Sequence, residues 1–502
     1  MDLFDNLLIG AQTAISVRGM FYALIGVVLG TAIGVLPGLG PVAAIAMLLP
    51  LTYGLQPELA LIMLAGIFYG SQYGGSTTSI LVNIPGESSS VVTCLDGHQM
   101  ARQGRAGTAL ATAAIGSFFA GTVSTVLIAG FAPVLATIAF RFGPAEYFSL
   151  MILGLVGAVA LAHGSMVKAL GMILIGLLLG LVGTDVTSGG QRFTFSLPDL
   201  FDGIDFVAIS MGLFGIAEVI ASAGRAGNRD ILTRRITGLL PSRSDLRRMA
   251  PAVLRGTAVG SFLGLLPGGG ATLSSFTSYA LEKKLSRTPG AFGRGAIEGV
   301  AGPESANNAA SQTSFIPMLT LGIPSNAVMA LMIGAMMMHN ITPGPQVAVT
   351  NPALFWGLIV SMWFGNLILL VLNLPMIGLW VKVLGVPYRL LFPAIVVLSC
   401  IGAYSVNGNG FGILLLAGFG LAGHLFAALE CEPAPLLLGF VLGPSMEEYF
   451  RRAMLIGDGD IAIFATRPLS AVLLGTAALV LLLFALPAIG RKRAEAFVEG
   501  EE

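Results

Sequence analysis

Charged side chains are scarce in this sequence. Only 10% of its 502 residues are Asp, Glu, Lys or Arg, whereas soluble globular proteins carry about 25%. A soluble protein of this length needs a charged surface to stay dispersed in water, so the shortage speaks against a soluble protein. The 26 basic and 26 acidic residues cancel, and no nucleic acid or other polyanion is expected as a partner.

Cysteine and histidine are also rare. The three cysteines form no C-x-x-C pair and the four histidines have no ligand spacing, so neither a disulfide framework nor a metal centre is expected. No GxxxxGK[ST] loop for ATP is present, and no HExxH or GxSxG motif was found. We therefore expect no enzyme and no cofactor other than a coupling Na⁺ or H⁺, with an ion gradient or another subunit supplying any energy.

The sequence is rich in long apolar stretches. Apolar residues make up 55% of the chain and the mean hydropathy is +0.86. Several stretches are near or above the roughly 20 residues that cross a bilayer as a helix; they are 107–137, 144–163, 166–183, 203–222, 352–380, 388–404, 409–429 and 468–489. The sequence predicts an all-α polytopic protein of the lipid bilayer with about 11–12 membrane segments.

The basic residues are clustered. Eight arginines lie between positions 225 and 255, against Asp230 and Asp245 as the acids of that stretch. Such an excess of arginine places a loop on the cytoplasmic side. The RKR run at 491–493 follows the last apolar segment and predicts a cytoplasmic C-terminus. The beginning of the chain lacks the basic region of a cleaved signal peptide.

Three motifs occur twice, in the same order. GVLPGLG at 34–40 matches GLLPGGG at 264–270, STTS at 76–79 matches SQTS at 311–314, and IPG at 84–86 matches IPS at 323–325. Three ordered matches indicate a tandem repeat of about 230 residues. Repeats that each cross the membrane an odd number of times are inverted, and we expect inversion here.

The repeat divides the chain into four parts. Residues 1–222 form the first transmembrane repeat and residues 223–250 an Arg-rich cytoplasmic linker. Residues 251–465 form the second repeat, and residues 466–502 an extra transmembrane helix with a cytoplasmic tail.

The first motif of each half breaks an apolar helix with proline and glycine. Proline removes a backbone donor and glycine permits left-handed backbone, and at membrane depth such breaks are tolerated where they line a cavity. The helix restarting after each break offers free N–H groups to a carboxylate, whereas helix ends with free carbonyls suit sodium. Paired breaks predict a substrate site near the bilayer midplane; a plain proline kink is the alternative. The candidate residues are Pro37, Gly38, Gly40, Pro267, Gly268, Gly269 and Gly270.

The second and third motifs concentrate Ser, Thr, Asn and Gln in a chain otherwise poor in them. We interpret them as a neutral, hydrogen-bonding lining of the site, in which 76–79 and 311–314 cap helices. The alternative is that small polar residues mediate helix packing. Among the ionisable residues in this region, Glu304 stands out because buried charge is costly and often functional. The further candidates for substrate binding are Ser76, Thr77, Thr78, Ser79, Asn83, Pro85, Gly86, Asn307, Asn308, Ser311, Gln312, Thr313, Ser314, Pro324, Ser325 and Asn326.

These motifs resemble the large membrane subunit of the tripartite tricarboxylate transporter family. The resemblance rests on GVLPGLGPVAAIAMLLPLTYGL (34–55), YGGSTTSILVNIPGESSSVVTCLDGHQMARQGRAGTAL (73–110), GLLPGGGATLSSFTSYALEKK (264–284) and PESANNAASQTSFIPMLTLGIPSNAVMALMIGA (303–335). It implies a bacterial inner-membrane permease that works with a small integral membrane subunit and a periplasmic solute-binding protein. It also implies sodium- or proton-driven import of small di- or tricarboxylates such as citrate.

Other functions stay open at this point. A channel, a scaffold or a carrier of non-carboxylate solutes is compatible with broken repeats. An intramembrane enzyme would need a nucleophile beside a base, or paired acidic ligands, and the sequence places no histidine next to a candidate nucleophile.

Overall fold

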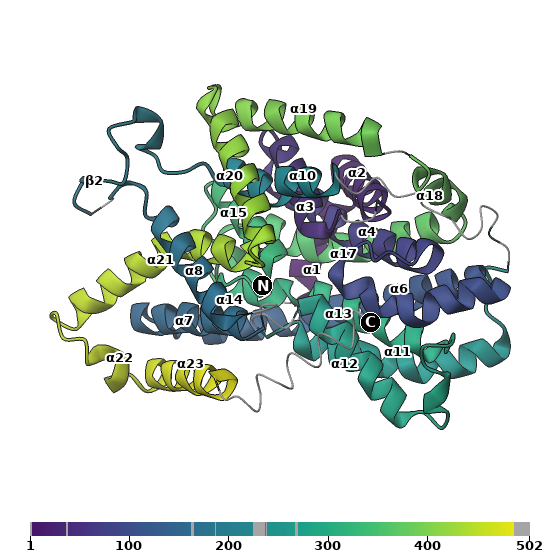
Figure 1. Cartoon of the computed structure of the whole chain (residues 1–502). Helices are drawn as coiled ribbons and strands as arrows, with labels where there is room; N and C mark the ends of the chain where they lie inside the picture. The colour runs from purple at the N-terminus through teal and green to yellow at the C-terminus, as the bar shows by residue number, and fades with distance from the viewer. Residues whose placement is uncertain are drawn as a thin grey trace.

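The structure is a computed structural model that describes residues 3–36, 39–161, 165–185, 187–223, 236, 238–266, 270–386 and 388–485 (Figure 1). Within these ranges the chain is helical, apart from a hairpin of two short antiparallel strands, β1 (Gly183–Thr184) and β2 (Gln191–Arg192). The all-α fold class is confirmed.

Most of the helices are joined by short connecting segments. Those of the first half are α1 (Leu3–Ala14), α2 (Val17–Gly34), α3 (Pro41–Leu48), α4 (Pro57–Val82), α5 (Val91–Thr93), α6 (Ala106–Ala139), α7 (Pro144–Leu161), α8 (Met166–Gly180), α9 (Phe206–Ser210) and α10 (Ala217–Ala223). Short 3-10 or π segments are η1 (Leu49–Thr52), η2 (Ser88–Ser90), η3 (Cys94–His98), η4 (Ala101–Arg105), η5 (Pro198–Leu200), η6 (Met211–Ile216) and, in the second half, η7 (Pro289–Ala291). The helices of the second half are α11 (Arg243–Leu263), α12 (Gly270–Leu285), α13 (Glu298–Thr313), α14 (Phe315–Leu321), α15 (Ala327–Met338), α16 (Val347–Thr350), α17 (Pro352–Asn373), α18 (Ile377–Val383), α19 (Tyr388–Asn407), α20 (Phe411–Ala428), α21 (Pro433–Ile456), α22 (Ile463–Thr466) and α23 (Pro468–Ala485).

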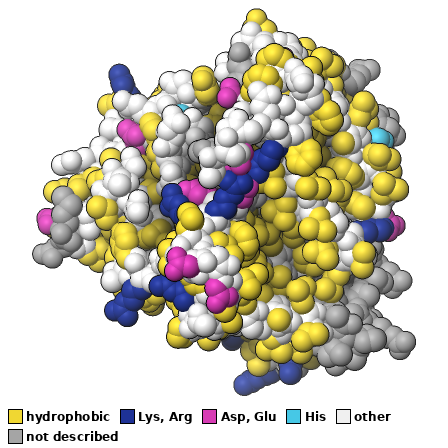
Figure 2. Space-filling view, turned by 90° about the vertical axis from the view of Figure 1, so that its left-hand side faces the viewer, with side chains coloured by type: hydrophobic (Ala, Val, Ile, Leu, Met, Phe, Trp, Pro, Cys, Tyr) yellow, Lys and Arg dark blue, Asp and Glu magenta, His cyan; other side chains and the backbone are white. Residues whose placement is uncertain are grey.

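Several of these helices fit a lipid environment. In the described ranges, four helical segments are long and apolar enough to cross a membrane: Val17–Gly34, Ala101–Phe131, Pro352–Asn373 and Phe411–Ala428. Seven shorter apolar helices of 10–17 residues accompany them. Figure 2 shows a molecular face covered mainly by hydrophobic side chains, with charged groups gathered in a few places. The number of crossings stays a prediction.

Two helix pairs show the same kind of close packing. In the first half α2 lies along α4, and in the second α11 lies along α13. An ideal Cβ at Gly30 would come within 2.3 Å of the Ile67 carbonyl oxygen, and one at Gly260 within 2.1 Å of the Ala306 carbonyl oxygen. Glycine at these positions therefore lets the two backbones touch, as small residues do between membrane helices.

The two halves of the chain share one hydrophobic core. Helices α6 and α4 of the first half pack against α13 and α17 of the second, and α1 packs on α17. The largest buried apolar cluster contains residues from both halves, among them Phe68 and Phe315, whose ring centroids are 6.3 Å apart. The polar motifs of the two halves are thereby brought into contact.

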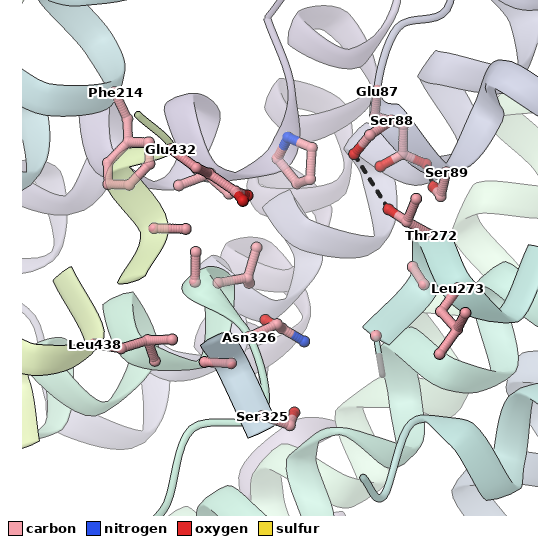
Figure 3. Close-up of a pocket in the computed structure, with 18 of the residues that line it drawn as sticks. Glu87, Ser88, Ser89, Phe214, Thr272, Leu273, Ser325, Asn326, Glu432 and Leu438 are labelled. Atoms are coloured by element: carbon pink, nitrogen blue, oxygen red, sulfur yellow. Dashed lines mark hydrogen bonds between the residues drawn. The ribbon is translucent and has the colours of Figure 1, made fainter. Parts of the chain in front are cut away.

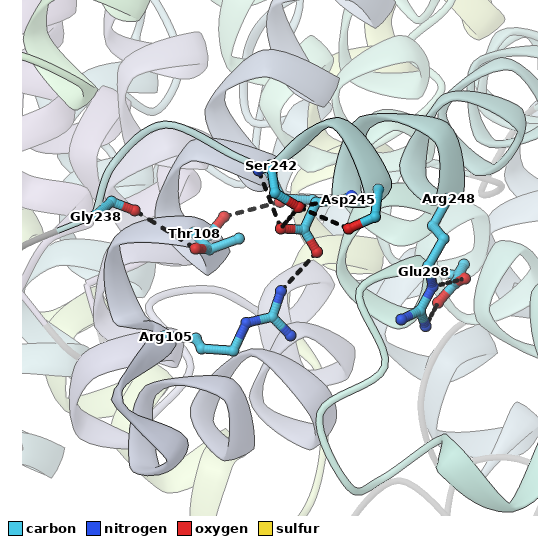
Figure 4. A network of polar contacts seen from close by, with 9 residues as sticks. Arg105, Thr108, Gly238, Ser242, Asp245, Arg248 and Glu298 are labelled. Atoms are coloured by element: carbon cyan, nitrogen blue, oxygen red, sulfur yellow. Dashed lines mark hydrogen bonds and ion pairs between the residues drawn. The ribbon is translucent and has the colours of Figure 1, made fainter.

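The second half begins with a helix fastened to the first half (Figure 4). Ser242 caps α11 through a capping box with Asp245, and Arg105 Nη2 lies 2.7 Å from Asp245 Oδ1. Arg248 makes two hydrogen bonds, of 2.8 and 2.7 Å, to Glu298. The end of the predicted Arg-rich linker thus forms the first two turns of α11; its residues 224–235 and 237, and the tail 486–502, lie outside the described residues.

We predict that Gly30→Ala and Gly260→Ala each lower the thermal unfolding temperature of the detergent-purified protein. The added methyl group would overlap a backbone carbonyl that no side-chain rotation can remove, and overpacking of this kind costs about 1–3 kcal/mol. Gly418→Ala in α20 is the control, because a Cβ there meets nothing within 4 Å. Equal unfolding temperatures for all three variants would contradict the packing described for the helix pairs.

Candidate functional site

Both predicted helix breaks are present. Helix α2 ends at Gly34 and α3 begins at Pro41, with Gly40 as its N-cap. Helix α11 ends at Leu263 and α12 begins at Gly270, which has a φ of +45°. The central residues of the breaks, Pro37, Gly38, Pro267, Gly268 and Gly269, lie outside the described residues.

Side chains from α4 and the loop after it secure the first break. Thr78 Oγ1 donates a 2.8 Å hydrogen bond to the Val35 carbonyl, one of the groups left without a helical partner where α2 ends. Gly86 sits against both helices, because a Cβ there would lie 2.4 Å from Gly75 Cα and 2.6 Å from the Gly34 carbonyl oxygen. The STTS and IPG motifs of the first half therefore shape the end of the broken helix.

A cavity of about 410 Å³ lies where the helices restart (Figure 3). Its lining includes the N-terminal residues of α3, α12 and α15. Asn326 caps α15 by accepting a 3.0 Å hydrogen bond from the Met329 amide. The facing wall comes from the start of α21, with Phe214 of η6 and Ala158 of α7. Four helix N-termini, those of α3, α12, α15 and α21, thus meet at one space, each with a partial positive charge.

Hydroxyl groups of both halves meet at this cavity. Thr272 Oγ1 donates to Ser88 Oγ at 3.2 Å, and Ser275 Oγ donates to the Ser89 carbonyl at 2.8 Å. Ser325 lines the cavity with 2% of its surface exposed, and its buried Oγ has no hydrogen-bond partner among the described residues. Among the described residues, this hydroxyl is therefore a buried polar group that still needs a partner.

A carboxylate that sequence reasoning missed also lines the cavity. Glu87 accepts hydrogen bonds from Ser89 Oγ at 2.6 Å and from Asn307 Nδ2 at 3.1 Å. The prediction of a wholly neutral lining is therefore wrong. The available signal was an acidic residue directly after Pro85 and Gly86 within an apolar region. Gln72, Thr272 and Glu432 were also missed.

Glu304, the acid noted in the sequence, lies outside the cavity lining at the contact of the two halves. It is 1% exposed and accepts a hydrogen bond of 2.6 Å from Ser76 Oγ and another from Thr93 Oγ1. Its carboxylate forms no ion pair with any residue that the structure describes. Such a buried charge is expensive unless a cation or a proton compensates it.

The polar clusters of α4 and α13 lie within helices rather than at their starts. The prediction that 76–79 cap a helix is wrong, because α4 continues to Val82. In 311–314, Ser314 alone stands at the N-cap position of α14, and its side chain makes no capping hydrogen bond. Hydroxyls inside a helix bond the carbonyl four residues earlier, as Ser79 Oγ does to Gly75 at 3.0 Å. Ser79 also bonds Ser90 Oγ at 2.9 Å.

Other predicted residues join helices of the two halves. Asn308 Nδ2 donates to Ser117 Oγ at 2.7 Å, and Gln312 Oε1 accepts from Thr125 Oγ1 at 3.1 Å. Thr77 and Thr313 donate to carbonyls of their own helix. Ser314, which follows the end of α13, donates to the Ser311 carbonyl, whereas Ser311 Oγ is buried without a partner among the described residues. For most of this set, the structure favours the helix-packing alternative.

The predicted site residues therefore separate into groups. Gly270, Ser325 and Asn326 line the cavity, and Gly40 caps the helix whose first residue, Pro41, lines it. Asn307 does not line the cavity but donates a hydrogen bond to Glu87, which does. Asn83 is an exposed left-handed residue that ends α4, and Pro85 and Pro324 do not belong to the lining. In the described ranges no group of three or more His, Cys, Asp or Glu residues is arranged to hold a metal ion.

Comparison with known proteins identifies a family and two similar proteins. Residues 20–438 match the family described as tripartite tricarboxylate transporter TctA. An uncharacterized 52.8 kDa protein in the TAR-I ttuC' 3' region of Agrobacterium vitis is 57% identical over 499 residues, 99% of each chain. An uncharacterized protein in the TAR-II ttuC' 3' region of the same organism is 59% identical over 242 residues, 48% of this chain and 100% of that protein. No solved structure matches.

The family match covers most of the chain and includes all of the repeated motifs. Together with the apolar helices, it makes this chain a multi-pass membrane protein and a transporter subunit, not an enzyme. The chain belongs to the tripartite tricarboxylate transporter TctA family.

Proposed function

We propose that this chain is the permease subunit of a binding-protein-dependent secondary transporter of the bacterial inner membrane. It imports small di- or tricarboxylates of the citrate type, driven by a sodium or proton gradient. Its partners are a small integral membrane subunit and a periplasmic solute-binding protein, as the family description supports.

The observation that carries this proposal is the meeting of four helix N-termini at one cavity. Helices α3, α12, α15 and α21 begin at its lining, and an N-terminus favours a bound anion through its free N–H groups and its dipole. The cavity, at about 410 Å³, has the size of small-molecule sites. The unpaired Ser325 hydroxyl adds a donor for a carboxylate.

Glu87 supports coupling to a cation. An anionic substrate beside an ionised Glu87 would be repelled, and like charges at close range in a poorly solvated site cost several kcal/mol. Its hydrogen-bond partners, Ser89 and Asn307, are neutral. A proton on Glu87 or a nearby cation removes the repulsion, so that substrate and cation bind together.

We further propose that the two halves are inverted repeats with about 11–12 crossings, with the boundaries expected from the sequence. Gly26, Gly30 and Gly34 recur 230 residues later as Gly256, Gly260 and Gly264. The first three contact α4 as the second three contact α13, which supports the duplication. Helix α23, in contrast to the repeated segments, has no matching segment in the first half.

Uptake by proteoliposomes tests the proposed function. The chain is reconstituted with its two partners, and a panel of labelled carboxylates is offered with and without sodium and pH gradients. Gradient-dependent accumulation of one or more carboxylates is expected. Equal uptake with all gradients dissipated would contradict coupling, and flux far above carrier rates, or transport of non-carboxylate solutes alone, would favour a channel or a different carrier.

We predict that Ser325→Ala weakens carboxylate binding about tenfold, because a hydrogen bond to a charged group contributes roughly 1.5–3 kcal/mol. Its Oγ has no partner among the described residues, so folding should not suffer. Ser399→Ala is the matched control, since Ser399 Oγ is likewise buried and unpartnered but lies in α19, outside the cavity lining. Titration of the purified protein with the transported carboxylate measures both affinities; equal weakening by the two substitutions would place the site elsewhere.

We also predict that Glu87→Gln makes carboxylate binding tighter at alkaline pH in the absence of sodium. The amide can still accept from Ser89 but no longer repels an anion. Gradient-driven accumulation should fall in proteoliposomes, because the compensating cation is no longer required. Weaker binding of the carboxylate by the variant under these conditions would show that the charge of Glu87 does not oppose the substrate.

A further inference from the structure

A second, much smaller cavity lies at the contact of the two halves. Its volume is about 10 Å³ and its lining is Tyr73, Ser76, Thr77, Leu110, Ala113, Ala114, Ser117 and Asn373. Each of its five polar side chains is at most 4% exposed. A space of this volume holds a single water-sized particle.

The lining offers oxygen lone pairs. Asn373 Nδ2 donates to the Leu369 carbonyl at 2.9 Å, while its Oδ1 is buried and unpartnered within the described ranges, as is Tyr73 Oη. Thr77 Oγ1 donates to the Tyr73 carbonyl at 3.4 Å, and Ser117 Oγ donates to the Glu304 carbonyl at 3.5 Å. Ser117 Oγ also accepts a 2.7 Å hydrogen bond from Asn308 Nδ2, so the free acceptors of this lining are chiefly Asn373 Oδ1 and Tyr73 Oη. An unpartnered amide oxygen suits a cation more than an anion.

The charge balance of the surroundings also favours a cation. Ser76 lines the cavity, and its Oγ donates a 2.6 Å hydrogen bond to Glu304 Oε2. Glu304 is buried and forms no ion pair in the part of the chain that the structure describes. A positive ion one hydroxyl away would compensate this carboxylate, and one carboxylate with neutral oxygens suits a monovalent ion better than a divalent one.

We propose that this cavity binds one dehydrated monovalent cation of the size of Na⁺, held by the oxygens of Tyr73, Ser76, Thr77, Ser117 and Asn373 and balanced by Glu304. The inference rests on the proposed function in one respect, since it locates the ion that would be coupled to transport. The site joins α4 and α6 of the first half to α17 of the second and, through Glu304, to α13. Occupancy would therefore stabilise the contact between the halves.

Thermal unfolding of the full-length chain in detergent, without any carboxylate, tests this site. Sodium chloride is titrated against choline chloride at constant ionic strength, with potassium chloride as a second comparison. The unfolding temperature of the wild-type protein should rise with sodium and saturate. Because no carboxylate is present, the result does not depend on whether the larger cavity binds one.

Tyr73→Phe is the decisive variant, because it removes an oxygen that has no partner among the described residues. It should raise the half-saturating sodium concentration about fivefold, as expected for one lost neutral ligand, and leave the unfolding temperature in choline unchanged. Thr77→Val, which removes another lining oxygen, should act in the same direction. Tyr69→Phe is the matched control: Tyr69 Oη is equally buried and unpartnered, one turn away in α4, but does not line the cavity.

Three results would overturn the proposal. The absence of a sodium-selective shift in the wild-type protein would show that the cavity holds only water or stays empty. A shift that depends on pH alone would show that a proton on Glu304 replaces the ion. An unchanged half-saturating concentration in Tyr73→Phe, or an equal change in Tyr69→Phe, would place sodium binding elsewhere.

Discussion

Every polar backbone group and every charge that this apolar chain buries needs a hydrogen-bond partner or a counter-charge. Residues of one half provide such partners for groups of the other half, and this exchange determines how the halves pack. The end of α2 has the Thr78 hydroxyl bonded to the Val35 carbonyl. The carboxylate of Glu304, from the second half, accepts from Ser76 of the first, and Asn307 donates to Glu87 in the opposite direction. Water is scarce at such depth, and an unsatisfied polar group costs several kcal/mol. The halves therefore interlock through their polar motifs, and glycines permit the necessary approach.

We assign different ligands to the two cavities. Helix N-termini and hydroxyls at the larger cavity are the basis for the proposed anion, and the oxygen atoms at the smaller cavity, beside Glu304, are the basis for the proposed cation. Asn307 and Glu304, one turn apart on α13, connect to the two sides. An anion in the larger cavity and a cation in the smaller one would partly compensate each other's charge, which is a physical basis for their joint transport.

The sequence predicted the breaks well and the partners of individual side chains poorly. A cluster of proline and glycine disfavours a continuous helix more strongly than a single such residue, so the ends at Gly34 and Leu263 and the restarts at Pro41 and Gly270 followed from local chemistry. Single prolines, such as Pro133 in α6 and Pro303 in α13, lie inside helices. The roles of the Ser and Thr clusters depend on which helices pack together, and this is set by tertiary contacts such as Ser117 with Asn308. For the same reason, the local pattern suggested helix caps at Ser76–Ser79. No local pattern reveals that Glu87 lies beside Asn307, so Glu87 was not among the predicted site residues.

A cryo-electron microscopy map of the assembled transporter with a transported carboxylate bound would locate the substrate directly. We expect ligand density in the larger cavity, with a carboxylate group within hydrogen-bond distance of the N-terminal residues of α12 or α15 and of the Ser325 hydroxyl. Density for the carboxylate between other helices, with this cavity empty, would contradict this expectation.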